Sequence, residues 1–149
     1  MIWGVISAKG RLYIVENTIR QDQYIKVLSE KLIQQTSEWF PNRDFLFMHD
    51  SAPCHKAKKV TKFLNDHQIK VLEWPGNSPD LNPIENVWTA LKKEIAKEKV
   101  ITNKQELIEK IIKAWFNTPE LKTISKNCID SMPRRLQEVI AQKGGFTKY

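Results

Sequence analysis

Short β-rich runs alternate with helical patterns along the first 75 residues, and this order restricts the fold class. "MIWGVIS" and "RLYIV" are separated by "AKG" and predict a β-hairpin. Residues 17–40 place apolar side chains close to helical spacing, and "DFLFMHD" at 44–50 is typical of a buried strand. A second helical pattern covers 56–67, and an alternating strand pattern covers 69–75. The order β-β-α-β-α-β predicts an α/β fold.

The remainder of the chain, from about residue 83 to 149, is predicted to be helical. The turn formers "GNSPDLNP" precede it, and an apolar stripe at helical spacing begins at Ile84. Two more helices are expected in "KQELIEKIIKAWF" and "MPRRLQEVIAQKGG", with Ser131 as a candidate N-cap and Gly144 as a stop signal. At 149 residues the chain is expected to form one domain.

The positive charge is concentrated in the second part of the chain. The net charge is +7, and residues 86–149 carry 13 Lys and Arg against 7 Asp and Glu, which is +6. Such a surface favours a polyanionic partner such as nucleic acid, although a solvated lysine-rich surface explains the charge as well. No apolar run has the length of a membrane span, and two cysteines indicate a reducing compartment better than a disulfide framework.

Two carboxylates are the candidate functional residues. Asp50 ends the apolar run at 44–50, and Glu85 follows after 34 intervening residues, 51–84. The helix and strand expected between them return the chain to the same edge of the sheet, where ligands of open α/β sheets bind. Carboxylate oxygens that converge from a strand end and a helix start suit a hard divalent cation such as Mg²⁺.

Each carboxylate also has a purely structural explanation. Asp50 could cap the helix that follows it. If Asn82 is an N-cap and Pro83 the first helical residue, Glu85 occupies the third position of a capping box. A glutamate in that role would use the same oxygens that a metal ion needs.

Other charged or metal-binding side chains give weaker indications. His49, Cys54 and His55 flank Asp50, but their spacing matches no standard zinc pattern. Lysines on the helix after Asp50 and two arginines near the C-terminus could contact DNA phosphates or form solvated helix faces. The candidate DNA-contacting residues are Lys56, Lys58, Lys59, Lys62, Arg134 and Arg135.

Three longer motifs resemble the catalytic domain of the Tc/mariner-like superfamily of DDE transposases. They are "HDSAPCH", "WPGNSPDLNPIENVW" and "SMPRRLQEVIAQKGGFTKY", and the Asp-34-Glu spacing resembles the Tc branch. The resemblance implies a ribonuclease-H-like mixed sheet with flanking helices, in which Asp50 and Glu85 are the second and third catalytic carboxylates. It also implies two Mg²⁺ or Mn²⁺ ions, DNA as partner and the nucleus as location, with homo-oligomers as a further expectation. Ser51 departs from the family's usual Asn.

The resemblance also predicts what residues 1–149 lack. The family's first catalytic Asp lies on a strand before the one that "MIWGVIS" resembles, and its helix-turn-helix DNA-binding region lies further upstream. We therefore expect a truncated catalytic domain without its first, central strand, inactive alone in divalent-metal-dependent DNA cleavage and strand transfer. The alternative is a non-catalytic, basic DNA-binding or protein-interaction module on an inherited fold.

Overall fold

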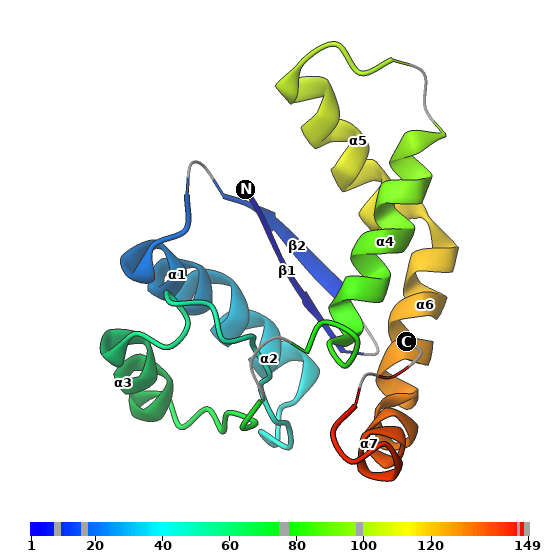
Figure 1. The fold of residues 1–149 in the computed structure, drawn as a ribbon. Helices are drawn as coiled ribbons and strands as arrows, with labels where there is room; N and C mark the ends of the chain where they lie inside the picture. Colours follow the sequence, from blue (N-terminus) through cyan, green and yellow to red (C-terminus); the bar gives the residue numbers. More distant parts are fainter. Residues whose placement is uncertain (8–9, 16–17, 75–77, 98–99, 146, 148–149) are drawn as a thin grey trace. The chain divides into compact units, whose positions relative to one another are not determined.

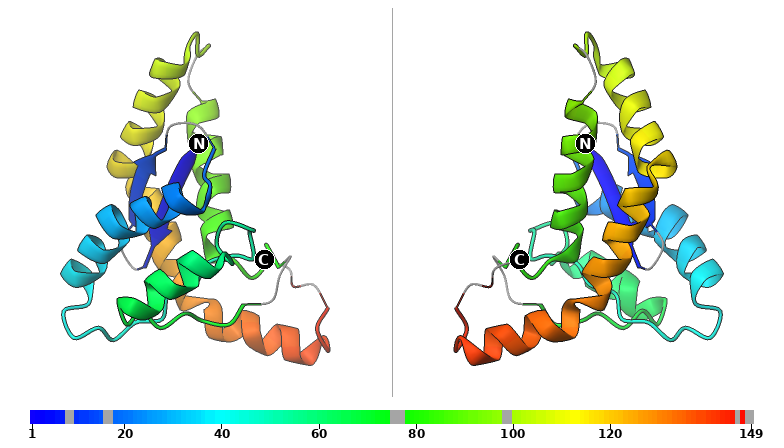
Figure 2. Two further views of the ribbon diagram at one scale, coloured as in Figure 1. Left: turned by 90° about the vertical axis from the view of Figure 1, so that its left-hand side faces the viewer. Right: turned by 90° about the vertical axis from the view of Figure 1, so that its right-hand side faces the viewer.

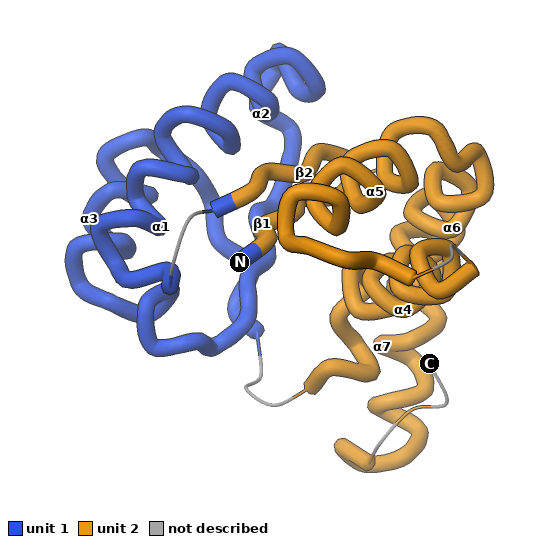
Figure 3. The backbone as a smooth tube through the Cα atoms, turned by 90° about the horizontal axis from the view of Figure 1, so that it is seen from above, with its two compact units in different colours: residues 1, 15–77 blue, residues 2–14, 78–149 orange. Residues whose placement is uncertain are grey.

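The structure, a computed structural model, describes residues 1–7, 10–15, 18–74, 78–97, 100–145 and 147. These residues form two compact units, each described by itself below (Figure 3). Unit 1 comprises Met1 and 15–77, and unit 2 comprises 2–14 and 78–149. The expected hairpin turn at residues 8–9 and the expected strand end at Pro75 lie outside the described residues, so both stay predictions. The expectation of a single domain also stays a prediction.

Unit 1 is built from one interrupted helical stretch and one separate helix. The stretch consists of α1 (Gln21–Val27), a π-helical segment η1 (Leu28–Ile33) and α2 (Gln34–Trp39), and the separate helix is α3 (Lys58–Asp66). Helix α1 packs against α3 (Figure 1). The helical spacing expected in 17–40 and 56–67 is thus confirmed. The buried apolar side chains of this unit are Val15, Tyr24, Val27, Leu28, Leu32, Phe47, Val60, Leu64 and Ile69.

Within the described residues, the strands expected at 44–50 and 69–75 are reduced to one parallel bridge, Phe47 to Val71. The Phe47 N–H donates to the Lys70 carbonyl at 2.9 Å, and the Leu72 N–H donates to the Phe47 carbonyl at 2.8 Å. Leu46 is 61% exposed, so the segment is not buried on both faces. An apolar, β-rich sequence favours extended backbone, but a strand also needs a partner backbone along its whole length.

Unit 2 combines the expected β-hairpin with four helices among its described residues. Strands β1 (Ile2–Ile6) and β2 (Gly10–Ile14) pair antiparallel, with Ile2 opposite Ile14 and Ile6 opposite Gly10. Helix α4 (Pro83–Ala96) packs against β1, α5 (Lys104–Asn117) and α6 (Pro119–Asp130), as Figure 1 shows. The core of this unit is formed by Val87, Leu91, Ile111, Trp115 and Leu121.

The hairpin approaches α4 closely at Gly4. A Cβ atom on Gly4 would lie 2.7 Å from the ring carbon Cη2 of Trp88, closer than real Cβ contacts come. Glycine at this strand position therefore permits the contact between β1 and the indole of α4.

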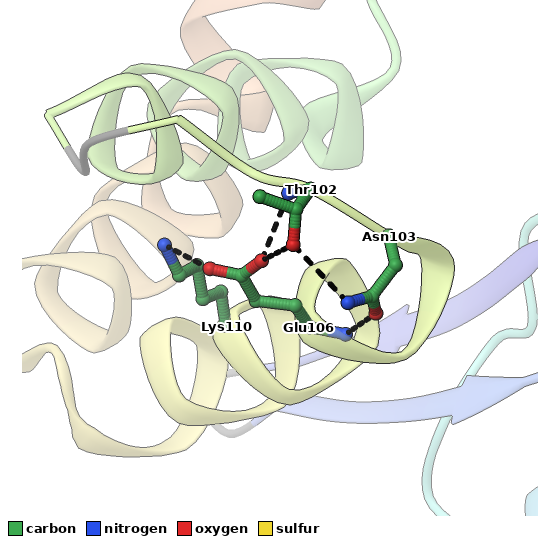
Figure 4. Close-up of polar contacts among 4 residues, drawn as sticks. All are labelled: Thr102, Asn103, Glu106 and Lys110. Carbon is green, nitrogen blue, oxygen red and sulfur yellow. Dashed lines mark hydrogen bonds and ion pairs between the residues drawn. The ribbon is translucent and has the colours of Figure 1, made fainter.

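Helix α5 begins with a network of polar contacts at its first turn (Figure 4). The Asn103 side chain accepts a hydrogen bond from the Glu106 N–H at 2.9 Å, and the Glu106 carboxylate accepts from the N–H and the hydroxyl of Thr102, each at 2.8 Å. Lys110 lies 3.1 Å from the other Glu106 oxygen. The pKa of Glu106 is lowered from 4.5 to about 2. The hydrogen bond from the Thr102 backbone N–H is the largest cause, and the Thr102 hydroxyl and Lys110 act in the same direction.

The C-terminal helices partly depart from the sequence expectation. Helix α7 (Met132–Ala141) was expected and Gly144, at φ +88°, follows it as the stop residue, but α6 was not foreseen. Ser131 precedes α7 without capping it by its side chain, because its hydroxyl donates to the Cys128 carbonyl at 2.7 Å. The chain turns sharply between α6 and α7 (Figure 2). No helix in the described part of the chain is long and apolar enough to cross a membrane.

Candidate functional site

Asp50 lies in unit 1, in the irregular segment after the bridge at Phe47. Its side chain is 57% exposed. The Ala52 N–H donates to Asp50 Oδ1 at 3.0 Å, which closes an Asx turn, and His55 Nδ1 donates to the same oxygen at 2.6 Å. Helix α3 begins later, with Ala57 as its N-cap, so Asp50 does not cap it. Both of these hydrogen bonds, from Ala52 and His55, use Oδ1 of Asp50, and neither uses Oδ2.

Aromatic and imidazole rings pack behind this turn. The Tyr24 ring, only 1% exposed, lies 4.1 Å from the His55 ring between centroids, and the Tyr24 hydroxyl and His49 Nδ1 share a hydrogen bond of 3.1 Å. The rings of His49 and His55 stack at 5.2 Å. The pKa of His49 is lowered from 6.5 to about 4. Burial is the largest cause, the neighbouring His55 acts in the same direction, and Asp50 opposes them. His49 is therefore neutral near pH 7.

Glu85 lies in the first turn of α4, as expected, but it does not complete a capping box. The Asn82 side chain accepts from the Ile84 N–H at 3.4 Å, so Asn82 is the N-cap. The Asn82 N–H, which a capping glutamate would bind, donates instead to the Pro79 carbonyl at 3.1 Å. Glu85 is exposed, and its carboxylate has no hydrogen bond or ion pair within the described part of the chain. The capping explanation of Glu85 therefore fails.

Arg135 is not the surface residue that its sequence context suggested. It is 2% exposed, and its guanidinium donates to Ser131 Oγ at 2.9 Å, to the Asp80 carbonyl at 2.9 Å and to Asn86 Oδ1 at 2.8 Å. Because the guanidinium is buried among these acceptors, it is not presented to a phosphate on the surface. The expected DNA contact of Arg135 is thus replaced by a structural role inside unit 2.

The other five basic candidates are exposed. Lys59 lies 3.3 Å from Asp22 and Lys62 lies 2.7 Å from Asp66, in ion pairs on the protein surface. Such exposed pairs are worth about 0–1 kcal/mol, so a DNA phosphate could replace the carboxylate in either one. The remaining candidates of this group are Lys56, Lys58 and Arg134.

The donor set fits a hard divalent cation. Asp50 presents Oδ2 and Glu85 presents its whole carboxylate, and such oxygens are the ligands that Mg²⁺ and Mn²⁺ prefer. The two residues belong to different units, so their shared site stays a prediction. In the described residues no group of three or more His, Cys, Asp or Glu side chains is placed to hold a metal ion.

Sequence reasoning missed the residues that support the helix turn of Glu85. The roles of Asp80, Asn86 and Thr147 depend on partners 49 to 67 positions away along the chain, and no local pattern reports such partners. The one available signal was that Asp80 and Asn86 flank Glu85 within "SPDLNPIEN".

Residues 1–108 match the family model described as DDE superfamily endonuclease, a match that includes both Asp50 and Glu85. The transposase of the transposable element Tcb1 of Caenorhabditis briggsae is 31% identical over 151 residues, which cover 100% of this chain and 54% of that protein. The chain spans about half the length of the curated relatives that it matches first.

Solved structures show the same fold. The catalytic domain of the Mos1 transposase of Drosophila mauritiana, with raltegravir and Mg, matches 95% of this chain and 71% of that one, at a TM-score of 0.77 and 22% identity. A Mos1 transposase paired-end complex with the left transposon end matches 93% of this chain and 40% of that one, at a TM-score of 0.75 and 23% identity. The likeness to a catalytic domain of this kind confirms the expected ribonuclease-H-like fold class.

Proposed function

Because the chain belongs to the DDE superfamily endonuclease family, we propose that Asp50 and Glu85 hold divalent metal ions in a transposase catalytic domain that cleaves and joins DNA strands. The observation that carries this proposal is the pair of carboxylates 34 residues apart inside the family match, neither of them used as a helix cap. The activity, the DNA substrate and the nuclear location are all parts of the proposal.

Each carboxylate is prepared for a cation by its local structure. His55 and the Ala52 N–H fix the Asp50 carboxylate through Oδ1, which leaves Oδ2 for a metal ion. Asn82 and the Pro79 carbonyl satisfy the start of α4, which leaves the Glu85 carboxylate for the same purpose. When bound, divalent ions activate a water or a 3′-hydroxyl and stabilise the leaving oxygen at phosphorus. Exposed Lys56 and Lys58 are placed beside Asp50 in sequence to attract the DNA backbone.

Metal binding at a shared site can be tested on the 149-residue chain with ¹⁵N NMR and paramagnetic Mn²⁺. We expect Mn²⁺ to broaden the amide signals of residues 50–55 and 82–86 at the same concentration, with Mg²⁺ as competitor. Asp50→Asn should remove the broadening in both segments. The control is Asp66→Asn, which neutralises an exposed carboxylate of α3 paired with Lys62 and should leave the broadening unchanged.

Broadening of one segment only, or broadening of 82–86 that survives Asp50→Asn, contradicts a shared site. A chain that binds DNA with strong salt dependence but shows no metal effect supports the alternative function, a basic DNA-binding module.

The 149 residues alone are expected not to cleave DNA. The family resemblance requires three carboxylates, and Asp50 and Glu85 match two of them. Incubation with Mg²⁺ or Mn²⁺ and DNA with the matching transposon ends should give no nicking. Nicking that Asp50→Asn abolishes contradicts this expectation.

A further inference from the structure

A buried arginine lies behind the turn that carries Glu85. Arg135 of α7 is 2% exposed, and its guanidinium makes hydrogen bonds to groups from three places in unit 2. Burial of a cation is destabilising unless its donors are satisfied, so the buried guanidinium depends on these hydrogen bonds. A lysine cannot reproduce these contacts, because its single ammonium lacks the planar fork of donors.

Two of the three contacts lie on either side of Glu85. Arg135 Nη1 donates to the Asp80 carbonyl, five residues before Glu85, and Nη2 donates to Asn86 Oδ1, on the residue directly after it. The first contact fixes the loop that enters α4, and the second fixes the rotation of the first turn of α4 about its axis. Because Asn86 is adjacent to Glu85, that rotation determines the direction in which the Glu85 side chain leaves the helix.

The third contact and a second network anchor this arrangement. Arg135 Nε donates to Ser131 Oγ at 2.9 Å, and Ser131 Oγ donates to the Cys128 carbonyl of α6 at 2.7 Å. From the other side, the N–H and the hydroxyl of Thr147 donate to Asp80 Oδ2 at 2.8 and 3.0 Å. The Thr147 N–H is the main cause of a lowered pKa at Asp80. The loop before α4 is therefore held by Arg135 of α7 and by Thr147 together.

We propose that Arg135 is a positioning residue for Glu85, acting through the Asp80 carbonyl and the Asn86 side chain to fix the carboxylate for a divalent cation. This inference rests on the proposed metal role of Glu85. In this proposal Arg135 is not itself a ligand of the cation.

The test measures Mn²⁺ affinity, from the free Mn²⁺ signal in electron paramagnetic resonance, for the 149-residue chain and its variants. Loss of a residue that orients a metal ligand typically costs 10- to 100-fold in affinity, and we expect Arg135→Met to weaken Mn²⁺ binding by about tenfold. The matched control is Lys122→Met, which removes an exposed cation of the neighbouring helix α6 and should leave the affinity unchanged.

Asn86→Ala keeps the arginine and removes only one acceptor, so it tests the positioning role of Arg135 even if Arg135→Met fails to fold. It should weaken Mn²⁺ binding alone and add little in the Arg135→Met background, because both variants break the same hydrogen bond. Amide exchange at Glu85 should accelerate in both variants, while exchange within α5 stays unchanged.

The outcomes separate the two proposals. Equal Mn²⁺ affinity of the unaltered chain and Glu85→Gln removes the metal role of Glu85, and the proposed function fails with it. A loss in Glu85→Gln together with unchanged affinity in Asn86→Ala and in folded Arg135→Met overturns the positioning role of Arg135 alone.

Discussion

His55 Nδ1 donates to Asp50 Oδ1 across 2.6 Å. A carboxylate only accepts hydrogen bonds, so this contact places a proton on Nδ1 of the imidazole. The Tyr24 ring lies 4.1 Å from the His55 ring between centroids and restricts its orientation. Asp50 is thus held by a side chain that is itself fixed by packing, as metal-binding carboxylates commonly are.

Replacing His55 by alanine is expected to weaken Mn²⁺ binding at Asp50 by about tenfold, because the carboxylate loses its orienting donor. Isothermal titration with Mn²⁺ on the 149-residue chain measures the effect. His67→Ala is the control. His67 is exposed, and its Nδ1 forms a hydrogen bond with the Phe63 carbonyl of its own helix end, away from Asp50 in sequence. Equal affinity in His55→Ala and His67→Ala means that His55 serves packing alone.

The lowered pKa of His49 predicts acid sensitivity. The unfolded chain binds a proton at His49 near pH 6.5, whereas the folded chain does so near pH 4. Between these values the unfolded state holds more protons, so the free energy of unfolding decreases as the pH falls from 6.5 to 4. Urea unfolding at several pH values measures this slope.

His49→Asn is expected to flatten that slope, because asparagine does not titrate but can still form a hydrogen bond with the Tyr24 hydroxyl. The variant His67→Asn removes an exposed imidazole and provides the comparison. A slope that is the same in His49→Asn and the unaltered chain assigns the acid sensitivity to other groups.

Glu106 predicts a second pH effect at the start of α5. Its folded pKa of about 2 lies below 4.5, so its contribution to stability is complete above pH 4.5 and is lost as the pH falls toward 2. Glu106→Gln should lower the thermal midpoint at pH 7, and the difference from the unaltered chain should shrink steadily below pH 4.5. Glu109→Gln is the control on the same helix. A difference between Glu106→Gln and the unaltered chain that does not change with pH shows that the carboxylate charge is not involved.

The lysines beside Asp50 predict salt-dependent DNA binding without sequence preference. Each phosphate contact that is lost should reduce the slope of log K against log salt concentration by about 0.9 on duplex DNA. Lys58→Ala is expected to produce this change, and Lys26→Ala is not. Lys26 is an exposed lysine of α1 that pairs with Glu30 of η1. Fluorescence anisotropy over a salt series measures both. Indistinguishable slopes remove Lys58 from the DNA surface.

Hydrophobic periodicity predicted most helices because each buries one face against a neighbour. Val60 and Leu64 of α3 and Val87 and Leu91 of α4 repeat at four-residue spacing and are buried as that spacing requires. Helix α6 escaped prediction although Pro119 marks its first turn, since its buried positions include the polar Ser125. Apolar periodicity detects a helix only where the packed face is apolar.

The sequence singled out the two candidate carboxylates and the neighbouring His55, but not the residues that support the helix turn of Glu85. Asp50 and Glu85 stand out through their motifs and spacing, whereas Arg135 resembles any basic residue on a helix surface. Its burial results from acceptors on Asp80 and Asn86 that only the tertiary fold brings to it. The strands at 44–50 and 69–75 were overestimated for a related reason: sequence reports extended conformation, but pairing depends on distant backbone.

The contact between Gly4 and Trp88 predicts correlated substitutions at two positions that are far apart in the chain. An alanine at position 4 would place its Cβ 2.7 Å from the rigid indole, so a larger residue in β1 requires a smaller one at position 88. Among related sequences the two sites should therefore change together: where residue 88 is tryptophan, residue 4 should remain glycine, and side chains at position 4 should occur in lineages that have already lost the indole.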